Sequence, residues 1–113
     1  MIDWGRVNAL RAEIGAEDFH EVVDLFLEEA DEVAARLSRP AVGVRREADC
    51  HFLKGSALNL GFDALASLCH VGEQAAAQGM AVDTKAIVAA YRDSRAAFIA
   101  GLAAAGGRAR VAG

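Results

Sequence analysis

The sequence predicts an all-α protein, an antiparallel four-helix bundle with an additional short N-terminal helix. Three observations support this fold class. Apolar residues make up 54% of the 113 residues, with one Pro and few aromatic residues, and this composition favours helices. Apolar residues recur at steps of three and four along most of the chain, which is the helical period. No segment alternates apolar and polar residues as a half-buried strand would.

The N-terminal part of the chain predicts two helices. Asp3 can cap a short helix that runs to about Glu13, and Gly15 can end it. A longer helix follows over about 17–37, with apolar residues at helical steps on one face. The other face of this helix carries a run of carboxylates, which we interpret as a solvated surface.

A loop and a third helix come next. Pro40 cannot continue the second helix, and Gly43 marks the loop that follows it. The third helix is predicted over about 44–60. Gly61 is its expected end, since glycine readily adopts the backbone conformation that stops a helix.

Two further helices complete the predicted bundle. The fourth covers about 62–78 and ends at Gly79, and Asp83 or Thr84 can cap the fifth. The residues expected to face inward on the fourth helix are Leu65, Leu68, Cys69, Gly72 and Ala76. Those expected to face inward on the fifth helix are Ile87, Val88, Tyr91, Phe98, Ile99 and Leu102.

The end of the chain lacks this pattern. Residues 106–113 show no apolar periodicity, so we expect a disordered tail there. Residues 1–105 are long enough to bury one core, and no linker or internal repeat interrupts them. The sequence therefore predicts a single helical domain over 1–105.

Charge and composition exclude several classes of partner. The net charge is −4, which argues against a nucleic-acid-binding protein because phosphate backbones require a basic surface. No apolar run approaches the length of a membrane span, and the N-terminus does not resemble a signal peptide. We therefore expect a cytoplasmic protein that does not contact a membrane. The two Cys residues are expected to be small buried side chains and not a disulfide.

The stretch 50–61 contains the main candidate site. On a helix His51 and Gly55 stack on one face, and Lys54 lies beside them. A glycine within a helix costs about 1 kcal/mol relative to alanine, so its presence here suggests that open space is needed above the imidazole. A nucleophilic ring, a gap and a cation together suit the docking and transfer of an anionic group such as phosphoryl.

Periodicity alone leaves another interpretation of His51 open. Lys54 favours an exposed histidine, because a lysine ammonium on the same side of the helix must reach water. A packed core histidine is the alternative, because steps of three and four also describe a core stripe. The residues of that stripe are Val44, Ala48, His51, Gly55 and Leu58.

A metal site is a less favoured interpretation. Cys50-His51 and Cys69-His70 provide four N/S groups of the kind that bind zinc. Neighbouring residues on a helix diverge by about 100°, so each pair cannot easily face one ion. The spacing also matches no standard zinc module, and the sequence predicts no metal ligands.

The stretch around His51 resembles a known signature. Residues 51–61 read His-Phe-Leu-Lys-Gly-Ser-Ala-Leu-Asn-Leu-Gly. They resemble the motif of histidine-containing phosphotransfer (HPt) domains, commonly His-x-Leu-Lys-Gly-Ser-(Ser or Ala)-x-x-(Leu or Val)-Gly. Residues 65–73 resemble the next helix of that family, and residues 3–4 and 24–30 fit its usual opening. The resemblance covers nearly the whole chain.

Two residues depart from the family pattern. Cys50 lies where the family often has alanine. Gly72 lies where an apolar residue usually precedes the acidic or amide position.

The resemblance implies a phosphorelay carrier. In this family a histidine takes a phosphoryl group from the aspartyl-phosphate of one receiver domain and passes it to another. By this resemblance His51 is the phosphoacceptor, and Lys54 offsets the charge of the phosphoryl group. Gly55 admits the receiver, and Glu73 accepts a hydrogen bond from the other ring nitrogen. Gln74 is the alternative for that last role, because glutamine often serves there in the family.

The resemblance also implies the partners, and the placement of residues around His51 predicts the docking surface. The partners are receiver domains of hybrid histidine kinases and response regulators, and the receiver would supply Mg²⁺. The chain has no nucleotide-binding motif, so we expect it not to phosphorylate itself and to bind no cofactor. Two alternatives remain, an adaptor bundle that carries no phosphate and a metal-binding bundle. The residues expected to contact a receiver are Ala48, Leu58, Leu10 and Ile14.

Overall fold

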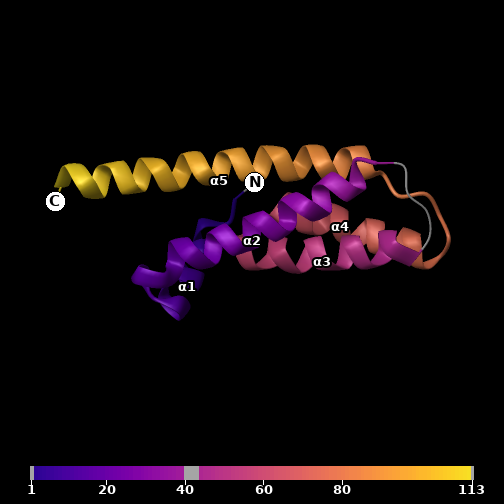
Figure 1. Cartoon of the computed structure of the whole chain (residues 1–113), viewed down its shortest axis with the longest axis horizontal. Helices are drawn as coiled ribbons and strands as arrows, with labels where there is room; N and C mark the ends of the chain where they lie inside the picture. The colour runs from indigo at the N-terminus through magenta and orange to yellow at the C-terminus, as the bar shows by residue number, and fades with distance from the viewer. Residues whose placement is uncertain (1, 40–43, 113) are drawn as a thin grey trace.

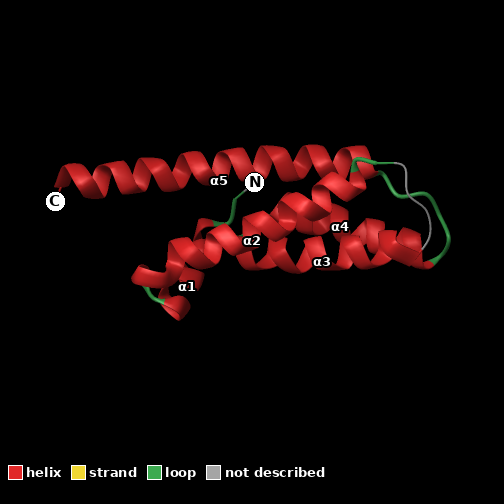
Figure 2. Cartoon of the chain, in the orientation of Figure 1, coloured by secondary structure: helices red, strands yellow, loops and turns green. Residues whose placement is uncertain are grey.

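The computed structural model describes residues 2–39 and 44–112, and these residues form five helices and no strand. Helices account for most of the described residues (Figure 2). The all-α prediction is confirmed, whereas the predicted loop at Pro40 and Gly43 falls outside the described residues. The helices are α1 (Trp4–Ile14), α2 (Ala16–Leu37), α3 (Val44–Leu60), α4 (Asp63–Ala77) and α5 (Thr84–Ala112).

The four-helix bundle consists of α2 to α5. Helix α2 contacts α3, α3 contacts α4, α4 contacts α5, and α5 contacts α2 again. The four helices therefore form a closed ring around one core, with sequence neighbours antiparallel. Helix α1 contacts α2 and α3 near one end of the bundle, as Figure 1 shows. This arrangement confirms the predicted bundle with an additional N-terminal helix.

Local sequence explains the ends of α1. The Asp3 carboxylate accepts a hydrogen bond of 3.1 Å from the Arg6 amide and thereby caps the helix. Gly15 ends α1 with a φ of 99°, a conformation that other residues rarely adopt. Helix α2 begins directly after it, so Gly15 determines the angle between the two helices.

The N-terminal residues attach α1 to the rest of the fold. Ile2 forms an isolated β-bridge with Phe62, and the Asp3 amide donates a hydrogen bond of 2.7 Å to the Gly61 carbonyl. Trp4 stacks on Phe98 of α5, with ring centroids 6.0 Å apart. The start of the chain thus contacts both the α3–α4 turn and α5.

Apolar side chains from all five helices fill the core. Two residues that were expected to face inward, Leu68 and Ile99, are 36% and 41% exposed. Leu68 lies at the margin of the inward stripe of α4, about 100° from the fully buried Cys69. The largest fully buried side chains are Phe19, Phe62, Phe98, Leu37, Leu53, Leu60, Leu65 and Ile87.

Helix α5 is longer than the sequence predicts. Its backbone is helical to Ala112, past residue 106, where we expect an irregular tail. No proline lies between 84 and 112, so every residue can make the i to i−4 hydrogen bond of a helix. Figure 1 shows the end of α5 extending beyond the other helices. None of the described helices combines the length and apolar character needed to cross a membrane.

Candidate functional site

The turn between α3 and α4 sets the register of the site. Gly61 has a φ of 77°, and a Cβ there would lie 2.6 Å from the Asp3 carbonyl oxygen, so only glycine fits. Phe62, which follows, is fully buried. The tight turn holds α3 and α4 side by side. His51 and Glu73 lie at nearly equal distances from it along the chain and therefore face each other.

Close packing beside the site depends on Gly72. A Cβ at this position would lie 3.1 Å from the Cys50 sulfur and 3.1 Å from Cδ1 of Ile87. Cys50 and Gly72, the two departures from the family motif, are thus in contact. The larger side chain on α3 occupies the space that the smaller residue on α4 leaves.

His51 is on the surface. Its side chain is 70% exposed, and its Nδ1 atom lies 2.7 Å from Oε1 of Glu73. This exposure contradicts the interpretation of His51 as a packed core residue. Gln74, the alternative partner, is exposed and makes no hydrogen bond to His51 within the described contacts.

Lys54 contacts the same carboxylate. Its Nζ atom lies 2.6 Å from Oε2 of Glu73, an oxygen that is sealed from solvent. The contact lies outside regular hydrogen-bond geometry, so we treat it as an electrostatic pair. The Lys54 ammonium lowers the pKa of Glu73 below its ordinary value of 4.5, with a smaller contribution from the His51 ring, while burial opposes the shift. Glu73 is therefore ionised at neutral pH.

The ionised carboxylate determines the form of the His51 ring. A carboxylate only accepts hydrogen bonds, so Nδ1 of a neutral His51 must carry the proton that it shares with Glu73. The other ring nitrogen, Nε2, then has a free lone pair. An imidazole in this tautomer on the surface can act as a nucleophile through Nε2.

Open space lies next to the ring. Apart from its two chain neighbours and the adjacent backbone of α3, nothing lies within 4 Å of the position that a Cβ on Gly55 would take. The helical turn at Gly55 is stabilised from within α3, since the Asn59 amide donates a hydrogen bond of 3.0 Å to the Gly55 carbonyl. Asn59 in turn accepts a bond of 3.2 Å from Arg6 of α1. The surface around His51 is therefore low and unobstructed on the Gly55 side.

The four residues that were expected to contact a receiver differ in their exposure to solvent. Ala48 and Leu58 are exposed on α3, and Leu58 is 57% exposed. Leu10 is only 5% exposed and belongs to the core, so its assignment to the docking surface is wrong. Ile14 is half-buried and packs against the core. The inward face of α1 holds α1 on the bundle and does not extend the surface around His51.

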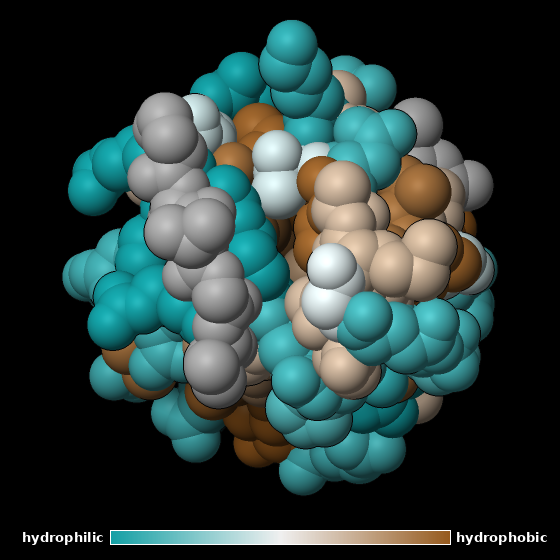
Figure 3. Space-filling view, turned by 90° about the vertical axis from the view of Figure 1, so that its right-hand side faces the viewer, coloured by the Kyte–Doolittle hydropathy of each residue, from teal (hydrophilic) through white to brown (hydrophobic). Residues whose placement is uncertain are grey.

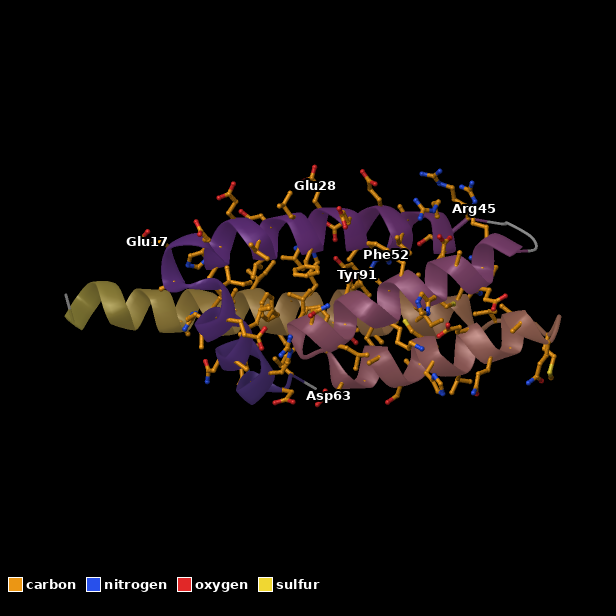
Figure 4. All side chains as sticks on the ribbon, turned by 90° about the horizontal axis from the view of Figure 1, so that it is seen from below. Glu17, Glu28, Arg45, Phe52, Asp63 and Tyr91 are labelled. Carbon is orange, nitrogen blue, oxygen red and sulfur yellow. The ribbon has the colours of Figure 1, made fainter. Side chains whose placement is uncertain are left out.

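Phe52 is a site candidate that the sequence analysis does not identify. Phe52 directly follows His51, and its ring is 40% exposed. Figure 4 shows it between α3 and α2. Phe52 occupies a variable position of the motif and no apolar stripe of α3. Adjacent helix positions are about 100° apart around the axis. Only its place next to His51 in the sequence therefore indicates that Phe52 lies near the histidine.

The remaining His and Cys residues do not join the site. His20 and His70 are exposed on other faces of the bundle, and Cys50 and Cys69 are free and buried. Burial raises the pKa of the Cys69 thiol to about 12. Within the described part of the chain, no three His, Cys, Asp or Glu side chains gather as metal ligands would.

Comparison with known families agrees with this geometry. The family model described as the Hpt domain matches residues 21–105, which include His51, Lys54, Gly55 and Glu73. The chain belongs to the Hpt domain family. Hpt domains are phosphocarriers that exchange phosphoryl groups with receiver domains of two-component phosphorelays. The comparisons with curated proteins and with solved structures found no match.

Proposed function

We propose that this chain is a phosphorelay intermediate that carries a phosphoryl group on Nε2 of His51. The observation that carries the proposal is the exposed His51 ring, whose Nδ1 is bound to Glu73 and whose Nε2 is free. Its partners are the receiver domains of hybrid histidine kinases and response regulators. The chain does not phosphorylate itself.

The transfer step uses three residues of this chain. Nε2 of His51 attacks the phosphorus of an aspartyl-phosphate in line, and the P–O bond to the aspartate breaks. The receiver's aspartate leaves as a carboxylate, and the ring, now bonded at Nε2 and protonated at Nδ1, is positively charged. The Glu73 carboxylate stabilises this charge at 2.7 Å from Nδ1.

Lys54 is the third residue of the transfer step, and it contributes a positive charge next to Glu73. Its ammonium is paired with Glu73 in the unphosphorylated protein, and a phosphoryl group on His51 would bring new negative oxygens within its reach. Because the Lys54 ammonium attracts both the Glu73 carboxylate and the phosphoryl group, it reduces the repulsion between these two negative groups. A receiver would supply Mg²⁺, which would neutralise charge on the transferred phosphoryl group.

The docking surface surrounds His51 on α3. It comprises Ala48, Gly55 and Leu58, with Phe52 as an addition. These residues offer small or apolar groups around a polar histidine, as a transient interface requires.

The decisive experiment is phosphoryl transfer from a receiver. The chain is incubated with a ³²P-labelled receiver domain, and the label on this chain is expected to be acid-labile and alkali-stable, as an N-phosphohistidine is. His51→Gln should abolish labelling and keep the helical circular dichroism spectrum, because glutamine fits a helix but lacks the ring. His20→Gln and His70→Gln are matched controls, since both residues are exposed, and they should retain full labelling. Label that persists in His51→Gln would disprove the assignment, and a receiver bound without label would favour the adaptor alternative.

A further inference from the structure

Most of the basic residues that have no described ion-pair partner lie in one place. Four of them, Arg39, Arg46, Lys85 and Arg92, line one groove and have no ion-pair partner within the described residues. We call this feature the basic groove. Four basic residues elsewhere are paired: Arg6 with Glu13, Arg36 with Asp49, Lys54 with Glu73 and Arg95 with Asp31. Arg11, which lies over Phe19, and Arg45 also have no ion-pair partner among the described residues.

The basic groove lies between the end of α2 and the beginning of α5. Its volume is about 500 Å³, and no acidic side chain lines it. The buried Leu37 and Val88 lie at its base. Figure 4 shows nitrogen atoms of several side chains beside Arg45, at this end of the bundle. Unpaired cations are thus concentrated at one end of a chain whose net charge is −4.

One cation of the groove is held in place before any ligand binds. Arg46 donates hydrogen bonds of 3.2 Å to the Leu37 carbonyl and 2.9 Å to the Arg39 carbonyl. Its guanidinium is therefore fixed at the end of α2 and loses little freedom on binding. An arginine held in this way favours planar, two-oxygen contacts such as those of carboxylates.

The spacing of the cations selects an extended anion. Lys85 and Arg92 lie two turns apart on α5, about 10 Å along the helix axis. Cations spaced along a groove in this way can each pair with a different anionic group of one extended ligand. An extended peptide advances about 3.3 Å per residue, so a segment of a few acidic residues covers the distance.

Apolar groups accompany the cations. Leu37, Val88 and Ala89 line the groove together with the four basic residues. Figure 3 views this end of the molecule and shows hydrophobic residues gathered on one side, with hydrophilic residues around them. Arginine is enriched in protein–protein interfaces, and the apolar base of the groove can bury an apolar side chain of a partner.

The groove and His51 face different directions. Arg46 and His51 are five residues apart on α3 and therefore project about 140° apart around the helix. A ligand in the groove leaves the His51 ring accessible. Occupation of the groove is thus compatible with docking of a receiver at His51.

We propose that the basic groove is a second docking site, which binds an acidic segment of a partner protein with an apolar residue among its carboxylates. Carboxylates of the segment pair with Arg39, Arg46, Lys85 and Arg92, and the apolar residue contacts Leu37 and Val88 at the base of the groove. The acidic face of α2 repels such a segment elsewhere on the chain, so the groove determines where it binds. This site does not depend on phosphorylation of His51.

A peptide titration tests this proposal. The probe is a fluorescein-labelled peptide Glu-Asp-Leu-Glu-Asp-Glu, added to ¹⁵N-labelled full chain at low salt, with an otherwise identical Gln/Asn peptide as control. We expect amide shifts at residues 37–39 and 84–92. The amide peptide, and 300 mM salt in place of 50 mM, should each weaken binding at least tenfold. Arg92→Glu should also weaken binding at least tenfold, and Lys85→Glu serves as a second variant if Arg92→Glu melts at a lower temperature.

Arg11→Glu is the matched control because it changes the net charge equally but lies on Phe19, away from the groove. It should bind the peptide within twofold of the unchanged protein. The proposal is overturned if the peptide does not bind, if its shifts lie outside the groove, or if Arg11→Glu and Arg92→Glu weaken binding equally. Stronger binding of inorganic tripolyphosphate than of the peptide would also overturn it, in favour of a phosphate site.

Discussion

At the residue scale, the carboxylate of Glu73 links the two charged partners of the site. It contacts Nδ1 of His51 through one oxygen and the Lys54 ammonium through the other. One side chain thus determines the tautomer of the nucleophile and holds the cation next to it. A glutamine in its place could accept from His51 but would not pair with Lys54.

The lowered pKa of Glu73 gives a prediction for acid pH. Because the folded-state pKa lies below the ordinary 4.5, ionisation of Glu73 stabilises the fold above pH 4.5, and this contribution disappears as the pH falls through the lowered pKa. The stability difference between the unchanged protein and Glu73→Gln should therefore be larger at pH 6 than at pH 3. Urea denaturation at both pH values measures it, and ¹³C NMR of the carboxyl carbon should give a midpoint below 4.5. A pH-independent difference would show that the carboxylate is not coupled to its neighbours.

The contact between Cys50 and Gly72 predicts coupled effects on stability. Gly72→Ala should destabilise the protein by about 1–3 kcal/mol, because its Cβ would press on Cys50 and Ile87 at 3.1 Å. The same change in a Cys50→Ala background should cost less, since alanine lacks the sulfur, although Ile87 keeps part of the cost. Urea denaturation of the four proteins measures the coupling, which we expect at about 0.5–3 kcal/mol.

Gly55→Ala is the control for this cycle. It makes the same change within a helix, but nothing lies within 4 Å of the new Cβ, so it should stabilise the protein by up to about 1 kcal/mol. Additive effects of Cys50→Ala and Gly72→Ala would contradict the compensation between the two residues.

The sequence predicts some site residues well and others poorly, for physical reasons. The spacing of His51, Lys54 and Gly55 within one helix suffices to place them together. The choice between Glu73 and Gln74 depends on the register of two helices, which the backbone of the Gly61 turn sets and which periodicity does not reveal.

At the element scale, the exposed side of α3 is the surface on which a receiver must dock. Gly55→Arg should block phosphoryl transfer to His51 by bulk and charge, with a melting temperature close to that of the unchanged protein, since the space above Gly55 is open. Leu58→Asp should weaken receiver binding about tenfold without unfolding the protein, because Leu58 is 57% exposed. Thermal melts and transfer rates of the two variants measure these effects. A Leu58→Asp protein that unfolds would place Leu58 in the core.

The helix boundaries follow closely from capping residues and glycines. Asp3, Gly15 and Gly61 lie at the ends that the sequence predicts, and the helices end there within one or two residues. Leu10 shows what this approach misses. The sequence of a short amphipathic helix shows that one of its faces is apolar. Only the packing of α1 on α2 and α3 decides whether that face is buried or belongs to a binding surface.

At the scale of the whole molecule, the end of α5 bears on which residue ends the folded domain. Helix α5 continues to Ala112 and extends beyond the other helices (Figure 1), whereas the family match ends at residue 105. We propose that residues 1–105 are the folding unit. A chain that ends at residue 105 should melt within about 2 °C of the full chain and accept phosphate at the same rate. Amide hydrogen exchange should be fast at 106–112 in the full chain. A truncated chain that melts much lower would assign the last turns of α5 to the domain.

The two buried thiols have a practical consequence for studying this protein. Only a thiolate reacts readily with alkylating or disulfide reagents, and in the native bundle both Cys50 and Cys69 are sealed from solvent and protonated. Any labelling of these side chains must therefore wait until α3 and α4 separate. The rate at which a thiol reagent modifies the unaltered chain thus reports how often the core opens. It does so without an added fluorophore, from one position next to His51 on α3 and one on α4.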